Sequence, residues 1–180
     1  MSKIAEGSNR FPRLLPISGV RLGAATAGIK YAARKDLMLA VFDRPVVVAG
    51  VFTRSATPSA AVKWDQSIIS HGKGRALVVN SGNANAWTGK AGAEAVQQTV
   101  RTTAKIVGCP MSQVFVSSTG VIGELLDHQK IMRKLPSLHK RASPKRWSEA
   151  ARAIMTTDTF PKGASRSIEV NGQIIRINGI

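Results

Sequence analysis

The sequence predicts one α/β domain over residues 1–180, built around a mixed β-sheet. Apolar runs typical of strands come first, a long helical pattern follows, and one more strand, two helices and a hairpin complete the chain. Because strands and helices do not alternate regularly, this order favours a mixed sheet over a doubly wound parallel sheet. The 180 residues, of which 43% are hydrophobic, suffice for one domain with a core, and no internal repeat divides them.

The first half of the chain predicts strands after an irregular lead-in over residues 1–13. The tripeptide Asp43-Arg44-Pro45 separates two apolar runs, which predicts a tight turn between antiparallel neighbours. The segments indicated as strands are residues 17–28 (a short strand or a loop), 36–42, 46–53, 60–64 and 75–80.

Helical periodicity dominates the second half. Apolar residues at spacings of three and four predict a helix over residues 88–107, and Gly108 and Pro110 are stop signals after it. The dipeptide Asn171-Gly172 between apolar residues predicts a hairpin. The elements indicated here are a strand at 113–118, a basic helix at 125–135, a helix that starts at Ser143-Pro144 and buries Trp147, Ala150, Ala151 and Ile154, and hairpin strands at 167–170 and 173–177.

Two stretches share one arrangement, in which a strand runs into a turn of small hydrogen-bonding residues. We name them the first elbow (residues 77–86, LVVNSGNANA) and the second elbow (residues 114–124, VFVSSTGVIGE). Small residues let a backbone approach a ligand closely, and fixed N–H and O–H donors stabilise a negative charge that develops on oxygen. The two elbows together suggest an oxyanion site, although each alone is also typical of a plain turn.

The other candidate residues do not supply a nucleophile. The glycine spacing after Gly82 is too long for a phosphate-binding loop, no His or Cys stands at metal-ligand spacing from another, and Cys109 has no nearby His. Residues 156–159 (TTDT) indicate either a substrate-binding segment or a helix end with its capping residues, and Lys162 suits a substrate carboxylate or solvent. The chain thus offers stabilisers of a transition state without a nucleophile.

The net charge of +16 is the strongest global feature. Basic residues are scattered along the chain, with one dense run over residues 130–146, and aromatic residues do not interleave with that run. This pattern favours a solvated face, a field that steers anions or an acidic partner over a nucleic-acid interface. No apolar run reaches the length of a membrane span, no signal peptide is evident and the single Cys109 forms no internal disulfide, so a cytoplasmic location is expected.

Three motifs resemble the ornithine acetyltransferase family in its α-chain portion. They are residues 79–86 (VNSGNANA) with Thr88-Gly89, residues 117–124 (SSTGVIGE), and residues 153–159 (AIMTTDT) with Pro161-Lys162; the segment GVFT at 50–53 also fits. Three long motifs in order, over most of the chain, make this a specific match. The resemblance implies a layered α/β sandwich with a mixed sheet, similar to the fold of self-processing N-terminal-nucleophile hydrolases.

The resemblance also implies an activity and a partner. Members of that family move an acetyl group from N-acetylornithine to glutamate in arginine biosynthesis, through a ping-pong cycle; some also accept acetyl-CoA, and no bound cofactor or metal is implied. Their precursor cleaves itself, and the Thr freed at the start of the β chain is the nucleophile. The expectation is therefore an α chain that is inactive alone and joins its β chain in an α2β2 heterotetramer. The family's Lys-Gly-Ser-Gly segment and cleavage-site Thr are expected beyond Ile180.

The site residues follow from the same resemblance. The family's oxyanion-hole pair falls on Thr119 and Gly120 in the second elbow, and a substrate-binding Thr falls within Thr156-Thr157, with Thr156 preferred. The first elbow carries no family role and is expected to form the floor of the site. Residues 54–58 (RSATP) and the heavy basic run depart from the family pattern, which leaves substrate preference open.

Two other functions remain open from the residues alone. A similar self-cleaving scaffold could release its acyl group to water, as an aminopeptidase or amidase does, and transfer of acetyl to glutamate separates that reaction from the first. A basic nucleic-acid-binding domain is a different class, and it would be revealed by salt-sensitive binding to nucleic acid.

Overall fold

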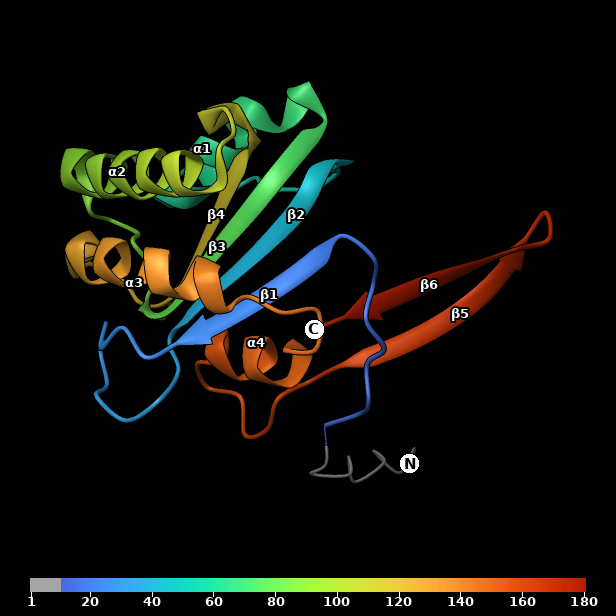
Figure 1. Cartoon of the computed structure of the whole chain (residues 1–180). Coiled ribbons are helices and arrows are strands. Elements are labelled where there is room, and N and C mark those ends of the chain that lie inside the picture. The colour runs from blue at the N-terminus through green and yellow to red at the C-terminus, as the bar shows by residue number, and fades with distance from the viewer. Residues whose placement is uncertain (1–10) are drawn as a thin grey trace, which may run out of the picture.

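A four-stranded mixed sheet forms the centre of the computed structural model, which describes residues 11–180 (Figure 1). The strands lie in the order β1-β2-β3-β4; β1 pairs antiparallel with β2, β2 antiparallel with β3, and β3 parallel with β4. Their bounds are β1 Val20–Ala25, β2 Leu37–Val47, β3 Lys73–Asn83 and β4 Val114–Val121. The predicted α/β class with a mixed sheet is confirmed.

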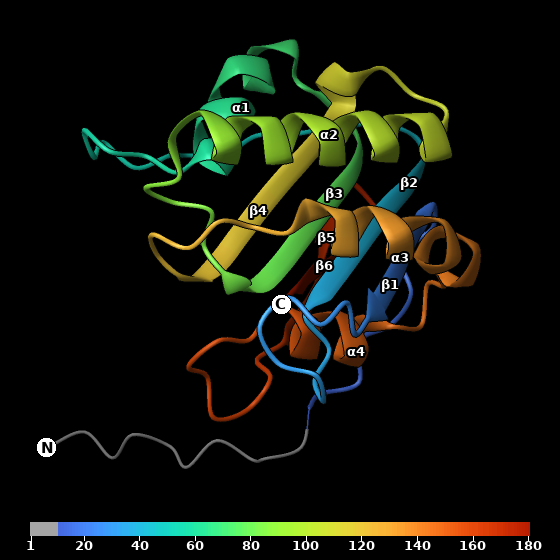
Figure 2. The same cartoon turned by 90° about the vertical axis from the view of Figure 1, so that its left-hand side faces the viewer.

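Helices cover both faces of this sheet, three on one side and one on the other (Figures 1 and 2). The first face carries α1 (Ala60–Ile68), α2 (Gly89–Val107) and α3 (His128–Arg141), and the second carries α4 (Trp147–Ala153). Two short 3-10 helices, η1 (Ile69–His71) and η2 (Met111–Gln113), precede β3 and β4. The layered sandwich expected from the resemblance is therefore present.

Alternation along β2 explains why the chain forms two cores. Leu37 and Leu39 point to the face that α2 and α3 cover, whereas Met38 and Ala40 point to the face that α4 covers. All four are buried, as expected for the period of two along a strand that lies between two layers. Trp147 and Ala150 of α4 fill the second core, in agreement with the predicted buried face of that helix.

The C-terminal hairpin projects away from the sheet as a separate two-stranded ribbon (Figure 1). Its strands are β5 (Ala164–Val170) and β6 (Gln173–Gly179), and the turn residues Asn171 and Gly172 both have positive φ, as a type I′ turn requires. The predicted hairpin is confirmed. Its register places Ile168 opposite Ile175, and both are exposed.

The predicted turn at Asp43-Arg44-Pro45 is wrong. Strand β2 continues through these residues, and its pairing with β3 shifts register between Val41 and Val46. Asp43 is drawn toward β1, because its N–H donates to the carbonyl of Gly19 at 2.9 Å and its carboxylate accepts from Arg21 at 2.8 Å. The irregularity is therefore a bulge within one strand, and residues 48–53 form no strand.

Two further element predictions are wrong. Residues 60–64 belong to helix α1, not to a strand, and the Ser59 side chain caps it by accepting from Val62 N–H at 3.3 Å. Helix α4 begins at Trp147 and not at Ser143-Pro144, because Ser143 exchanges two backbone hydrogen bonds with Leu22 of β1.

The remaining predicted elements are present with shifted ends. The basic helix predicted at 125–135 is α3 at His128–Arg141, which contains Pro136. Residues 11–13 are irregular as predicted, and the rest of the predicted lead-in, residues 1–10, lies outside the described residues.

Candidate active site

The two elbows lie side by side at the carboxyl ends of the parallel strands β3 and β4. Ser81 is opposite Thr119 and Gly82 is opposite Gly120 in the strand register. The contact continues past the strands, because Ala84 N–H donates to the carbonyl of Val121 at 2.9 Å. The carboxyl edge of parallel strands is where open α/β sheets place ligands, so the elbows lie where this fold class has its binding sites.

The polar side chains of the first elbow are directed inward and already paired. Asn80 donates to the carbonyl of Asn83 at 2.8 Å and accepts from the Ser118 hydroxyl at 2.6 Å. Asn85 donates to the carbonyl of Gly92 at 3.0 Å, and both elbow asparagines 83 and 85 are buried. The bond from Ser118 ties the second elbow to the first. The side chains of Asn80 and Asn85 are therefore engaged within the protein and are not free donors, and the role of the first elbow as a floor stays a prediction.

The second elbow presents Thr119 and Gly120 outward. The Thr119 side chain is half-buried, and its hydroxyl makes no hydrogen bond to another of residues 11–180. Gly120 has φ +136°, a conformation that L side chains rarely adopt, and its backbone lies directly against that of Gly82 and Asn83. The elbow therefore needs glycine at this position for both conformation and space.

One cavity of about 350 Å³ brings all four predicted site residues together. Thr119, Gly120, Thr156 and Thr157 line it, although the two pairs are separated by more than thirty residues of sequence. The complete lining is Tyr31, Arg34, Gly82, Thr119, Gly120, Val121, Thr156 and Thr157. Arg34 supplies the cavity's charged side chain.

Tyr31 and Arg34 are cavity residues that the sequence pattern did not predict. They belong to the connection between β1 and β2, residues 26–36, which we name the β1–β2 loop. Nothing in their local pattern sets them apart from other basic and polar loop residues. Only the tertiary structure, which carries this loop across the end of the sheet, reveals their place in the cavity.

The β1–β2 loop is held rigidly at both ends. The buried carboxylate of Asp36 accepts from the N–H groups of Ala27 and Ile29, each at 2.6 Å. Lys30 forms an ion pair with Glu124, next to the second elbow, at 2.8 Å. A loop with these anchors can keep side chains at fixed positions in a site.

The segment after α4 forms the opposite wall of the cavity. Thr156 N–H donates to the Asp158 carboxylate at 3.3 Å, and Asp158 also pairs with Lys162. The hydrogen bond from Lys162 holds the pKa of Asp158 below its usual range. Lys162 also lies 5.3 Å from the centre of the Phe160 ring and does not line the cavity, so its contacts stay within its own segment.

A second cavity, of about 330 Å³, lies between α1 and the start of α2. Lys63, Trp64 and Thr88 are among its lining residues, but none of the four predicted site residues reaches it. Its size is similar to that of the cavity at the elbows, so volume alone does not distinguish the two. We place the candidate site where the predicted residues converge.

Residues 11–180 contain no group of three His, Cys, Asp or Glu side chains that could hold a metal ion. Burial raises the pKa of the Cys109 thiol, which keeps it protonated and unsuited to act as a nucleophile. The cavity itself contains hydroxyl and backbone donors but no activated nucleophile among its lining residues.

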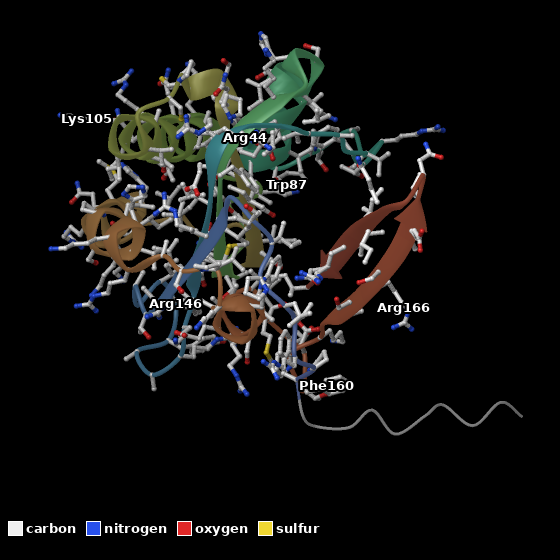
Figure 3. All side chains as sticks on the ribbon, turned by 45° about the vertical axis from the view of Figure 1, so that its right-hand side comes forward. Arg44, Trp87, Lys105, Arg146, Phe160 and Arg166 are labelled. Carbon is white, nitrogen blue, oxygen red and sulfur yellow. The ribbon has the colours of Figure 1, made fainter. Side chains whose placement is uncertain are left out.

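Basic residues lie on several parts of the molecule. Lys105 on α2, Arg146 before α4 and Arg166 on β5 lie on separate parts of the molecule (Figure 3). Arg146 is paired with Glu149 at 3.0 Å. No helix in the described part of the chain is long and apolar enough to cross a membrane.

Comparison with known proteins identifies relatives over nearly the whole chain. "Arginine biosynthesis bifunctional protein ArgJ" from Brucella suis biovar 1 (strain 1330) is 52% identical over 170 residues, which is 94% of this chain and 41% of that protein. The protein with the same description from Gluconobacter oxydans (strain 621H) is 48% identical over 169 residues, 94% of this chain and 40% of that protein. The chain thus spans about two-fifths of the length of these relatives.

Solved structures share the fold as well as the sequence. The crystal structure of arginine biosynthesis bifunctional protein ArgJ from Bacillus halodurans matches with a TM-score of 0.84 and 33% identity, over 90% of this chain and 85% of that one. Ornithine acetyltransferase from Mycobacterium tuberculosis, solved in complex with ornithine, matches with a TM-score of 0.82 and 32% identity, over 91% and 87% of the two chains. The ArgJ family pattern itself covers residues 21–180. The chain therefore belongs to the ArgJ family.

Proposed function

We propose that this chain is the α chain of a glutamate N-acetyltransferase, which moves acetyl from N2-acetylornithine to glutamate in arginine biosynthesis. The observation that carries the proposal is the cavity in which Thr119 and Gly120 face Thr156 and Thr157. It offers donors for an oxyanion and hydroxyls for a substrate, yet its lining residues include no activated nucleophile. A site of this kind needs a second chain to supply the attacking group.

The proposed chemistry is a two-step acyl transfer. The hydroxyl of the partner chain's Thr attacks the acetyl carbonyl carbon of N2-acetylornithine, and the carbonyl oxygen becomes negative. The Thr119 hydroxyl and the Gly120 N–H donate to that oxygen and lower the barrier. Collapse of the intermediate breaks the C–N bond, ornithine leaves with the proton from the Thr, and the acetyl group remains as an ester. The amine of glutamate then attacks the ester carbonyl carbon through the same oxyanion site. The C–O bond to the Thr breaks, the Thr oxygen regains a proton from the attacking amine, and N-acetylglutamate leaves.

Substrate binding is assigned to the wall opposite the oxyanion donors. Thr156, with Thr157 beside it, faces the same cavity from the segment after α4. A hydroxyl there can donate to or accept from the acetylated amino acid while its carbonyl lies against Thr119 and Gly120. The cycle needs no bound cofactor or metal, and acetyl-CoA would enter only as an alternative acetyl donor.

The partner is proposed to be the β chain of the same precursor, in an α2β2 heterotetramer in the cytoplasm. The matched part is 41% of the length of the Brucella suis relative, and the remaining length supports a further segment that could form such a β chain. Exposed apolar residues support a contact near the site. Trp87 directly follows the first elbow and Ile122 lies within the second, close to where Gly123 N–H donates to the carbonyl of Ala86 at 2.9 Å. The net charge of +16 suits an acidic partner.

The exposed hairpin offers a second contact surface. The register of β5 and β6 places Ile168, Val170, Ile175 and Ile177 on one face, and all four are exposed. A two-stranded ribbon is marginally stable by itself in water, so a covering partner would account for this apolar face. We refer to it below as the apolar hairpin face.

The test is acetyl transfer from N-acetylornithine to glutamate by this chain co-expressed with the downstream half of its precursor. Transfer that requires both halves supports the proposal. Associated halves that release acetate or cleave amides without transfer to glutamate would instead favour the hydrolytic alternative. Acetyl-CoA, tried as donor in the same assay, measures whether the acetyl-enzyme can also form from a thioester.

A further inference from the structure

We infer that Arg34 is a positioning residue, which fixes the Thr156–Thr157 wall of the cavity opposite Thr119 and Gly120. The inference rests on the proposed function for its kinetic readout, because Thr156 is assigned there to substrate binding. Its structural basis is independent of that assignment. Arg34 comes from the β1–β2 loop, more than a hundred residues before the segment that it holds.

The contacts of Arg34 run to backbone atoms of the opposite wall. One terminal nitrogen donates to the carbonyl of Met155, and the other lies 3.5 Å from the carbonyl of Thr156. A planar guanidinium with donors on two nitrogens can reach adjacent carbonyls at once, which a single ammonium group cannot do. The contacts therefore fix the backbone just where Thr156 enters the cavity.

Arg34 is itself held in place. Its guanidinium carbon lies 5.6 Å from the centre of the Tyr31 ring, within the range of a cation–π contact. The β1–β2 loop that carries both residues is anchored by Asp36, whose carboxylate accepts from two backbone N–H groups at 2.6 Å. These contacts anchor the loop that carries the guanidinium. The position of the loop therefore fixes the position of the segment that Arg34 contacts on the opposite wall.

The segment that Arg34 holds has few other restraints. It contains no helix or strand between Ile154 and Gly163. Its internal contacts are the Asp158 bonds to Thr156 N–H and Lys162 and the contact of Lys162 with the Phe160 ring. Without Arg34, the distance between the Thr156 side chain and the oxyanion donors would be poorly fixed. A misplacement of about 1 Å in a site can reduce the catalytic efficiency, kcat/KM, by about a hundredfold.

The matched control is the next residue in the chain. Lys35 belongs to the same loop and pairs with Glu149 of α4, but it does not line the cavity. The variants Arg34→Ala and Lys35→Ala each remove one basic side chain. Arg34 contacts two backbone carbonyls of the segment after α4, whereas Lys35 contacts the Glu149 side chain of α4. Only the first should loosen the wall of the site.

The kinetic test uses the complete αβ enzyme and a double-mutant cycle with Thr156→Val. Arg34→Ala should raise KM for N-acetylornithine by about tenfold or more, with kcat changed by less than about threefold, because it removes binding and not the reacting groups. In the Thr156→Val background the same substitution should change KM by less than about threefold, since the residues act as one unit. Arg34→Lys should restore part of the loss, and Lys35→Ala should leave KM unchanged. If the fold-changes in KM from Arg34→Ala and Thr156→Val simply multiply in the double variant, the inference is overturned.

Amide hydrogen exchange on the same αβ proteins separates this inference from the proposed function. Arg34→Ala should accelerate exchange at residues 155–158 by about tenfold or more, whereas Lys35→Ala should not. Unchanged exchange there would overturn the inference even in an active enzyme. Faster exchange in an enzyme without acetyl transfer would keep the positioning role and reject the proposed reaction. If Arg34→Ala does not fold, Arg34→Lys and Tyr31→Ala can be measured for the same two quantities, KM for N-acetylornithine and amide exchange at residues 155–158. Protection from exchange at 155–158 should fall in both variants. Protection equal to that of the unsubstituted enzyme would contradict the positioning role.

Discussion

Replacing Gly120 with alanine tests the geometry of the second elbow. An ideal Cβ on Gly120 would lie 2.3 Å from the carbonyl carbon of Gly82, 2.5 Å from the nitrogen of Asn83 and 2.7 Å from the carbonyl oxygen of Gly82. All three atoms are backbone atoms of strand β3, which cannot move aside without breaking its pairing with β4. The φ of +136° adds conformational strain for any L side chain.

These contributions set the expected size of the effect. Strain at such a backbone conformation costs about 1–3 kcal/mol, and forcing extra volume into a packed contact costs a further ~1–3 kcal/mol. Together they amount to about 2–6 kcal/mol, against a total stability of about 5–15 kcal/mol for a typical domain. Gly120→Ala should therefore lower the stability of the αβ protein substantially and disturb the alignment of the two elbows.

Gly123→Ala is the matched control for this substitution. Gly123 also has a positive φ, of +84°, but no heavy atom lies within 4 Å of the position that a Cβ would take. Gly123→Ala should carry the conformational strain alone, about 1–2 kcal/mol. Urea unfolding of the two αβ variants measures the difference. A midpoint for Gly120→Ala equal to that of Gly123→Ala would refute the argument that the elbows are in backbone contact.

Three further predictions concern the rest of the chain. Burial raises the pKa of Asp65 from 3.8 to about 7, so the folded state holds this proton more tightly than the unfolded state and loses stability as pH rises from about 4 to about 7. Asp65→Asn should therefore raise the free energy of unfolding at pH 8 by roughly 1 kcal/mol, after a discount for solvent screening, and leave it nearly unchanged at pH 4. A gain of equal size at both pH values would contradict this. Asp36→Ala leaves two N–H groups of the β1–β2 loop unpaired and should cost about 2–4 kcal/mol in urea unfolding, and a loss below about 1 kcal/mol would show that the loop is anchored elsewhere. Ile175→Asp on the apolar hairpin face should reduce co-purification with the β chain, whereas Ile174→Asp on the opposite face should not; equal behaviour of the two would remove that face as a contact surface.

Local sequence pattern predicted best the elements that carry a strong periodic or turn signal. The strands that enter both elbows, the long helix after the first and the Asn171-Gly172 hairpin carry strong periodic or turn signals, and all are present. The turn predicted at Asp43-Arg44-Pro45 is wrong because bulges and turns use similar residues. Only the hydrogen bonds of Asp43 with Arg21 and Gly19 show that this segment is a bulge. Residues 60–64 are too short an apolar run to separate strand from helix.

The composition of the cavity needed the three-dimensional structure. Motif resemblance assigned Thr119, Gly120, Thr156 and Thr157, but the parallel pairing that sets the elbows side by side depends on long-range contacts. Arg34 gave no signal, because its partners are backbone carbonyls more than a hundred residues away and backbone atoms leave no mark in a sequence. The sequence likewise did not predict that the asparagine side chains of the first elbow form hydrogen bonds inside the protein.

The most direct test of the central claim is the rate of acetyl transfer by the complete αβ enzyme with Thr119 replaced. If the Thr119 hydroxyl donates to the oxyanion, Thr119→Ala should reduce kcat/KM for transfer from N-acetylornithine to glutamate by about a hundredfold or more. Thr119→Ser, which keeps the hydroxyl, should retain most of the activity. A decrease of less than about threefold in a folded Thr119→Ala enzyme would contradict the role of this elbow as the oxyanion site.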